Sequence, residues 1–80
     1  MRAHVYVMLK RGVLDPQGKA IEHSLHALGF SEVEEVRLGK FVDLQLADGD
    51  RENAAKRLDE MCRQLLANGV IEDYRFEIVS

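Results

Sequence analysis

The number of strands in this chain is decided by the stretch Val36-Arg37-Leu38-Gly39-Lys40-Phe41-Val42-Asp43. It lies in an alternating run, residues 33–47, in which Val42, Leu44 and Leu46 share one face as in a half-buried strand. Gly39-Lys40 interrupts that run, and a glycine with a polar neighbour between two alternating segments is typical of a hairpin turn. We therefore predict a hairpin here. A single long bent strand with a bulge at Gly39 is the alternative.

Two strands and two helices flank the predicted hairpin. A period of two over residues 5–9 and again over residues 74–78 predicts a strand near each end of the chain. Helical spacing over residues 16–28, and again between Asp50 and Asn68, predicts two helices. The order βαββαβ indicates an α+β fold of the ferredoxin-like type, a four-stranded antiparallel sheet with two helices on one face. Eighty residues form one domain, residues 1–80.

Residues 12–20, Gly-Val-Leu-Asp-Pro-Gln-Gly-Lys-Ala, are close to a phosphate-binding loop but depart from it where the chemistry is strict. Ala20 replaces the hydroxyl that would meet Mg²⁺, and Pro16 removes an N–H donor. Asp15 places a negative charge where an anion would bind. The same residues suit a helix start, because Asp15 is a good N-cap and Pro16 is favoured at the first helical position. We therefore predict a strand-to-helix junction.

No group of residues has the spacing of a reactive site. Cys62 lies in the middle of a helix on its apolar stripe, where a packed core residue is expected. His23 and His26 are one helical turn apart, but no third ligand converges on them. We therefore predict no catalytic, cofactor-binding or metal-binding residue on this chain.

Composition points away from nucleic acid and from membranes. A formal net charge of −3 offers no broad attraction for a polyanion. RNA-recognition domains share the predicted element order and stack bases on aromatic residues, and Tyr6 and Phe41 are suitably placed, but Asp43 and Glu77 would repel phosphate. A single cysteine and the lack of a long apolar run favour a cytoplasmic protein without a membrane partner.

The predicted topology brings two sets of residues to the surface. The first lies along the edge where the strand-to-helix junction meets the hairpin, and its members are candidates for a partner interface: Lys10, Asp15, Arg37, Gly39 and Lys40. The second lies on the sheet face that no helix covers, and its members are candidates for self-association: Tyr6, Met8 and Phe41. Ordinary surface charge and scattered exposed apolar groups are the alternatives.

Four short segments carry a resemblance to a known family: residues 7–10, residues 12–18, residues 36–40 and residues 71–74, which read Val-Met-Leu-Lys, Gly-Val-Leu-Asp-Pro-Gln-Gly, Val-Arg-Leu-Gly-Lys and Ile-Glu-Asp-Tyr. Their order and spacing resemble the PurS family, the small subunit of phosphoribosylformylglycinamidine synthase. The resemblance spans essentially the whole chain.

The resemblance implies a noncatalytic subunit of a carbon-nitrogen ligase in purine biosynthesis that uses glutamine as amide donor. In that family a glutaminase subunit releases ammonia, and a large synthetase subunit uses ATP and Mg²⁺ to convert formylglycinamide ribonucleotide to formylglycinamidine ribonucleotide. The small subunit, a homodimer or higher homo-oligomer, bridges the two and assists ammonia transfer. The alternative is a small regulatory module of the same fold that binds a ligand at a dimer interface.

Overall fold

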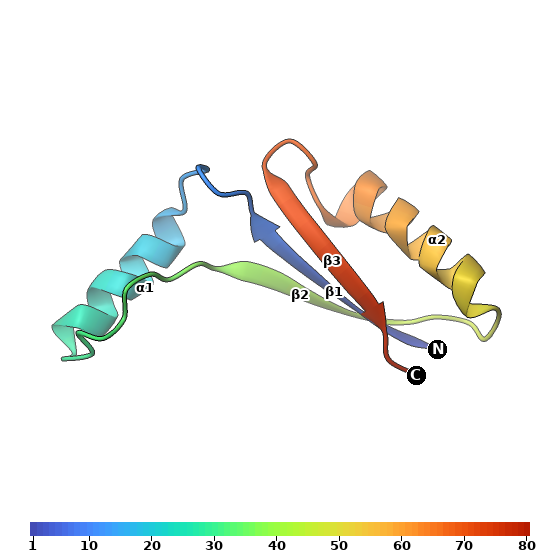
Figure 1. The fold of residues 1–80 in the computed structure, drawn as a ribbon, viewed down its shortest axis with the longest axis horizontal. Helices are drawn as coiled ribbons and strands as arrows, with labels where there is room; N and C mark the ends of the chain where they lie inside the picture. The colour runs from blue at the N-terminus through green and yellow to red at the C-terminus, as the bar shows by residue number, and fades with distance from the viewer.

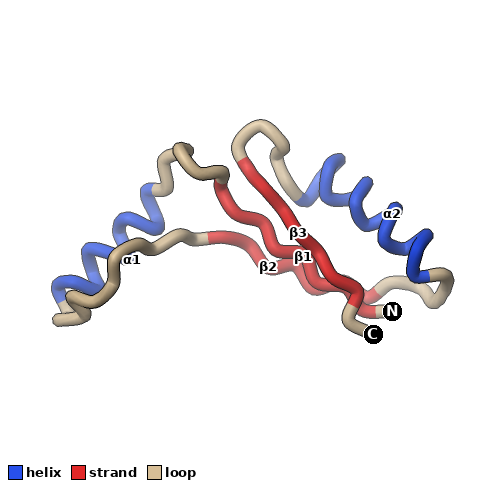
Figure 2. Tube along the Cα trace, in the orientation of Figure 1, coloured by secondary structure: helices blue, strands red, loops and turns tan.

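The computed structural model describes residues 1–80, which form three strands and two helices in alternation (Figure 1). The three strands make one antiparallel sheet in the order β2-β1-β3 (Figure 2). Both helices and the two terminal strands form where the periodicity predicts them. The elements are β1 Arg2–Leu9, α1 Pro16–Ala27, β2 Gly39–Gln45, α2 Arg51–Met61, η1 Cys62–Leu66 and β3 Glu72–Ile78. The short element η1 is a π-helical continuation of α2.

The predicted hairpin is wrong, and the sheet has three strands rather than four. A two-residue hairpin turn needs a positive φ at its glycine, and Gly39 does not have one. Instead Gly39 pairs with Met8 inside the β1–β2 ladder, whose register runs on without a bulge to Gln45. Residues 33–38 join no strand, and the backbone N–H of Leu38 donates to the Asp15 side chain instead of a neighbouring strand. The four-stranded ferredoxin-like sheet therefore does not form.

Gly39 begins β2 because the backbone passes very close to β1 there. A Cβ atom at this position would lie 2.5 Å from the carbonyl oxygen of Val7 and would overlap the sulfur of Met8. Gly18 in α1 has a similar role, since a Cβ atom would lie 2.6 Å from the carbonyl oxygen of Val36. Both glycines thus permit a close approach between segments that are distant in the sequence.

Only α2 packs on the sheet. Leu58 of α2 and Cys62 meet Ala3, Val5 and Val7 of β1 to form the buried core. Helix α1 instead lies beyond the end of the sheet, with residues 30–38 running back beside it (Figure 1). The expected pair of helices on one sheet face is therefore absent, because the chain after α1 does not turn back over the sheet.

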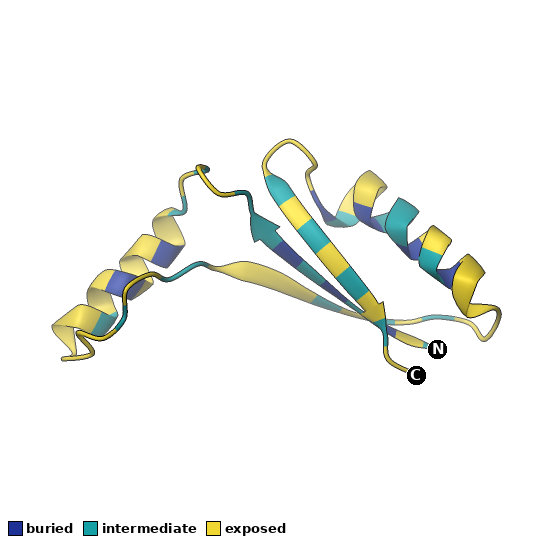
Figure 3. Cartoon of the chain, viewed as in Figure 1, coloured by how far each residue is buried: buried dark blue, intermediate teal, exposed yellow.

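The resulting monomer is elongated and exposes much of its surface (Figure 3). Its radius of gyration is 16.0 Å, against about 12 Å for a compact chain of this length. Only 9 of 80 residues are buried. The accessible surface is 5813 Å², about 900 Å² more than the roughly 4,900 Å² typical of a folded monomer of 9.1 kDa. The chain is therefore less compact than a typical folded monomer of this size.

Candidate partner-binding surfaces

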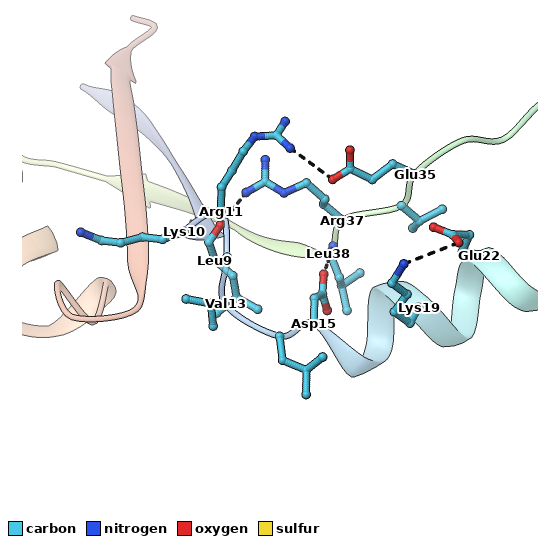
Figure 4. Close-up of a pocket in the computed structure, with 13 residues that line it drawn as sticks. Leu9, Lys10, Arg11, Val13, Asp15, Lys19, Glu22, Glu35, Arg37 and Leu38 are labelled. Atoms are coloured by element: carbon cyan, nitrogen blue, oxygen red, sulfur yellow. Dashed lines mark hydrogen bonds and ion pairs between the residues drawn. The ribbon is translucent and has the colours of Figure 1, made fainter.

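Asp15 fastens the start of α1 to the segment that leads into β2 (Figure 4). One carboxylate oxygen accepts the N–H of Gly18 at 2.9 Å, which caps the helix, and the other accepts the N–H of Leu38 at 3.0 Å. These hydrogen bonds, the one from Leu38 first, hold the pKa of the Asp15 carboxyl below its usual value. Both oxygens are thus already occupied by the chain's own backbone.

We expect replacement of the Asp15 carboxylate to lower the stability of the fold in a pH-dependent way. The folded-state pKa of Asp15 is lowered, so its contribution is fully present above the unfolded-state pKa of about 3.9 and is lost as the pH falls through the folded-state pKa. Asp15→Asn is expected to lower the free energy of unfolding at pH 7, and its difference from wild type is expected to shrink as the pH falls below about 3.9. Urea titrations across this range, with Glu32→Gln as control, measure it. A loss in the free energy of unfolding that is the same at every pH contradicts a role for the ionised Asp15 carboxylate.

A cavity of about 320 Å³ lies between the loop after β1 and the segment before β2. Two of its cations pair with carboxylates that also line it: Arg11 meets Glu35 at 3.3 Å and Lys19 meets Glu22 at 3.8 Å. The Arg37 guanidinium donates to the carbonyl oxygen of Leu9 (Figure 4). Because three carboxylates line the cavity beside its cations, it has little excess positive charge to attract a phosphate group.

The remaining lysines of the candidate interface turn toward the start of β3. Lys10 meets Asp73 with a nitrogen-to-oxygen distance of 3.8 Å. Lys40 meets Glu72 at 3.6 Å and donates to the carbonyl oxygen of Leu66 at 3.4 Å. The structure therefore places all five candidates at one end of the sheet, and divides them into a group around Asp15 and a group around β3. Most of these ion pairs are solvent-exposed, so they contribute little to stability and their side chains remain available to a partner.

The sheet face without a helix carries an aromatic cluster. The rings of Tyr6 and Phe41 are 5.3 Å apart between centroids, and the His4 ring approaches Phe41 edge-on at 4.9 Å. The Arg75 guanidinium lies 4.0 Å from the centre of the Tyr6 ring. Phe41 is 57 % exposed. Of the self-association candidates, Met8 lies one step farther along β1, opposite Gly39.

The hydroxyl of Tyr6 ties this face to β3 by a hydrogen bond to Glu77 at 3.0 Å. That carboxylate raises the pKa of the Tyr6 phenol, because it accepts the phenolic proton and repels the phenolate. Arg2 and Asp43 pair at 2.7 Å on the same face. The aromatic surface is therefore framed by charges that balance one another.

The two outer edges of the sheet differ in how many backbone N–H and C=O groups have no hydrogen-bond partner. In an antiparallel sheet, the backbone N–H and C=O groups of successive residues point alternately toward a neighbouring strand and away from it. The hydrogen bond from the Leu46 N–H to the Met1 carbonyl oxygen shows that the even-numbered residues of β2 face β1. The outward backbone groups are those of Gly39, Phe41, Asp43 and Gln45.

On β3 the corresponding outward positions are partly taken. Arg51 donates to the Ile78 carbonyl at 2.8 Å, and the Glu72 N–H donates to Asn68 at 2.7 Å. The outer edge of β2 is thus the longer free edge of the sheet.

The apolar stripe of α1 is exposed, whereas the predicted packing of two helices on one sheet face would bury it. Leu28 is 73 % exposed and Ile21 is 39 % exposed. Leu14, which precedes the helix, and Phe30, which follows it, are also exposed. Their helical spacing was the available signal, but it shows only that the stripe is apolar.

The single thiol of the chain is not available for nucleophilic chemistry. Cys62 is fully buried, and burial raises the pKa of its thiol, with the Asp59 carboxylate adding to the effect. No cluster of three or more His, Cys, Asp or Glu side chains has a geometry that would hold a metal ion. No helix has the length and apolar character needed to cross a membrane.

Comparison with known proteins gives a consistent result. The family model for PurS, described as phosphoribosylformylglycinamidine (FGAM) synthase, matches residues 2–80. The PurS subunit of this synthase from Bacillus subtilis (strain 168) is 49 % identical over 77 residues, which cover 96 % of this chain and 90 % of the relative. The PurS subunit from Methanocaldococcus jannaschii is 40 % identical over 77 residues, covering 96 % of this chain and 93 % of that one.

Solved structures agree. B. subtilis PurS in a C2 crystal form, 48 % identical, gives a TM-score of 0.85 and covers 99 % of this chain and 98 % of that chain. A chain in the structure of PurLQS from Thermotoga maritima, 29 % identical, gives a TM-score of 0.89 and covers 98 % and 95 %. These matches confirm the family resemblance of the sequence. The chain therefore belongs to the PurS family, the small subunits of the phosphoribosylformylglycinamidine synthase of purine biosynthesis.

Proposed function

We propose that this chain, as a homodimer, is the noncatalytic subunit that bridges the glutaminase and synthetase chains of the synthase and assists the transfer of ammonia between them. The observation that carries the proposal is the likeness to a chain of the T. maritima assembly named PurLQS, which covers nearly the whole of both chains. The cytoplasm is the proposed location, in keeping with an unpaired thiol.

The chemistry of the chain supports a noncatalytic role. Hydrolysis of glutamine through a covalent intermediate needs an accessible thiolate beside a base, whereas Cys62 is buried with a raised pKa. The junction that resembles a phosphate-binding loop has its carboxylate committed to backbone N–H groups. We therefore assign glutamine hydrolysis to the glutaminase subunit, and ATP, Mg²⁺ and the ribonucleotide to the synthetase subunit.

The role that we propose for this chain is to hold the surfaces of the other subunits together. Ammonia is a small neutral molecule that becomes protonated in bulk water and then loses its nucleophilic lone pair, so its passage needs a route that excludes water. Closely packed subunit interfaces can form such walls without reactive side chains. The end of the sheet with Lys10, Asp15, Arg37, Gly39 and Lys40 is the proposed contact with a larger subunit. The aromatic cluster around Phe41 borders the free β2 edge and is the proposed self-association surface.

We expect reversal of the Lys40 charge to weaken assembly with the larger subunits. Lys40→Glu places a carboxylate beside Glu72 and changes the charge that a partner meets. The affinity for the larger subunits is expected to fall about fivefold to tenfold, mainly through slower association, and the association rate is expected to depend less on salt because less attraction remains to be screened. Surface-immobilised wild type and variant, titrated with each purified subunit, give the rates. Lys56→Glu on the exposed side of α2 is the matched control. Equal affinities for the two variants contradict the proposed contact.

Recovery of partners from the protein's own cells tests the function itself. A tagged chain is expected to co-purify with a glutaminase and a synthetase of purine biosynthesis. Calorimetry of the isolated chain with ATP, glutamine and the ribonucleotide is expected to show no binding. A tight complex of the chain alone with any of these ligands, without partner recovery, supports a regulatory module instead and contradicts the bridge.

A further inference from the structure

We infer that the cavity between the loop after β1 and the segment before β2 receives a basic side chain, arginine or lysine, of a larger subunit, and that the Glu22 carboxylate accepts its hydrogen bonds. The inference rests on the proposed function and specifies one contact within it. It adds Glu22 of α1 to the residues proposed for the partner interface.

The Glu22 carboxylate is buried without a hydrogen bond from its own chain. Glu22 is the only charged residue among the buried ones, with 9 % of its surface exposed. Its one charged partner is Lys19 of the same helix, whose side chain is 65 % exposed and whose nitrogen lies 3.8 Å from the carboxylate, beyond hydrogen-bond distance. A carboxylate removed from water needs hydrogen bonds or a paired cation to offset the loss of solvation. Glu22 therefore retains unused capacity to bind a cation.

The walls of the cavity suit the stem of a long basic side chain. The cavity has a volume of about 320 Å³, and its apolar lining consists of Leu9, Val13, Leu14, Val36 and Leu38. Figure 4 shows Glu22 on one side of this cavity and the apolar side chains of Leu9 and Val13 on the other. Arginine and lysine bury their methylene groups along apolar surface while the charged end meets a polar group. Apolar walls with a carboxylate at one side thus match this kind of side chain.

The other two carboxylates of the cavity are already engaged. Asp15 accepts two backbone N–H groups, one with each oxygen. Glu35 is paired with Arg11 at 3.3 Å, and both of these side chains are largely exposed. An entering cation therefore finds its free acceptor at Glu22.

The cations of the cavity leave room for another one. The Arg37 guanidinium donates to the Leu9 carbonyl oxygen, and Lys10 meets Asp73 of β3. The exposed amine of Lys19 can move into solvent when a second cation approaches Glu22. Repulsion between the cations of the chain and an entering basic group is thus limited.

The position of the cavity identifies the chain that supplies the basic group. Lys10, Asp15 and Arg37 line this cavity, and all three belong to the proposed contact with a larger subunit. None of the residues proposed for self-association lines it. The cavity is therefore continuous with the surface assigned to the glutaminase or the synthetase. A basic side chain paired with a carboxylate at the centre of an interface is a common source of binding energy.

Glu22→Gln tests the contact, because it removes the charge and keeps the shape of the side chain. The rate of dissociation from one of the two larger subunits is expected to rise about 30-fold or more, with little change in the rate of association. Glu32→Gln removes the same charge from an exposed position outside the cavity and is expected to change this rate less than about threefold. Surface-immobilised chains titrated with each purified subunit give both rates. Equal dissociation rates for the two variants overturn the inference.

Val13→Phe keeps the test decisive if the Glu22 variant folds poorly. The larger side chain narrows the cavity and leaves every charge in place. Dissociation from the same subunit is expected to become about tenfold faster, because the entering side chain no longer fits. Urea denaturation of the isolated chains monitors the folding of each variant. Dissociation of the Val13 variant at the wild-type rate overturns the insertion.

Loss of this contact and loss of the bridge give different results. If Glu22→Gln dissociates like Glu32→Gln while glutamine-dependent turnover still requires the chain, the basic contact is excluded and the bridging function stands. If the wild-type chain binds neither larger subunit, the bridge is contradicted and the contact with it.

Discussion

Leu58→Ala is expected to lower the free energy of unfolding by about 3 kcal/mol. Leu58 is completely buried and is the largest side chain of the core, where it packs from α2 onto β1. Removal of its branched end loses apolar burial and leaves a cavity that a small sheet with one covering helix cannot fill. A chain of 80 residues has roughly 4–12 kcal/mol of total stability, so the variant loses a large part of it.

Urea denaturation at a fixed protomer concentration measures this effect, because the proposed self-association makes stability depend on concentration. Leu65→Ala is the matched control, since Leu65 lies one turn from the same core but is 83 % exposed. The control is expected to change stability by less than about 0.5 kcal/mol. A similar loss in both variants would show that Leu58 is not the centre of the core.

Gly39→Ala is expected to lower stability by about 2–3 kcal/mol, although a change from glycine to alanine within a strand normally stabilises it. The new methyl group would lie 2.5 Å from the Val7 carbonyl oxygen, which is backbone and cannot rotate away. β2 must therefore move from β1, and the proposed self-association surface beside its free edge moves with it.

The comparison for Gly39 is Gly49→Ala, where a Cβ atom would meet nothing within 4 Å. The Gly49 variant is expected to unfold at the same urea concentration as wild type or slightly above it. A Gly39 variant that is as stable as the Gly49 variant would be incompatible with the close approach of β1 and β2.

Local signals predicted most elements of the fold correctly. Asp15 and Pro16 marked the start of α1, and the alternation of residues 74–78 marked β3. The hairpin failed because a glycine that serves as a turn and a glycine that permits two strands to approach look alike in the sequence. What distinguishes them is the contact of Gly39 with Val7 and Met8, more than 30 residues away. No local pattern contains that information.

The candidate sites also show that local sequence patterns do not determine contacts between distant parts of the chain. The sequence placed Tyr6 and Phe41 together on an open sheet face, because a period of two determines which residues share a face. It did not reveal that α1 lies off the sheet. Amphipathic spacing showed that Ile21 and Leu28 are on an apolar side of a helix, but it does not determine which chain covers that side. That depends on tertiary geometry that only the structure supplies.

We propose that this chain joins two enzymes and does no chemistry itself. The most direct test of this proposal is synthase turnover by purified glutaminase and synthetase, with either glutamine or free ammonium as nitrogen donor, in the presence and absence of this chain. Glutamine-dependent turnover is expected to require the chain, whereas turnover at saturating ammonium is expected to proceed without it. Full glutamine-dependent turnover in its absence would contradict the account.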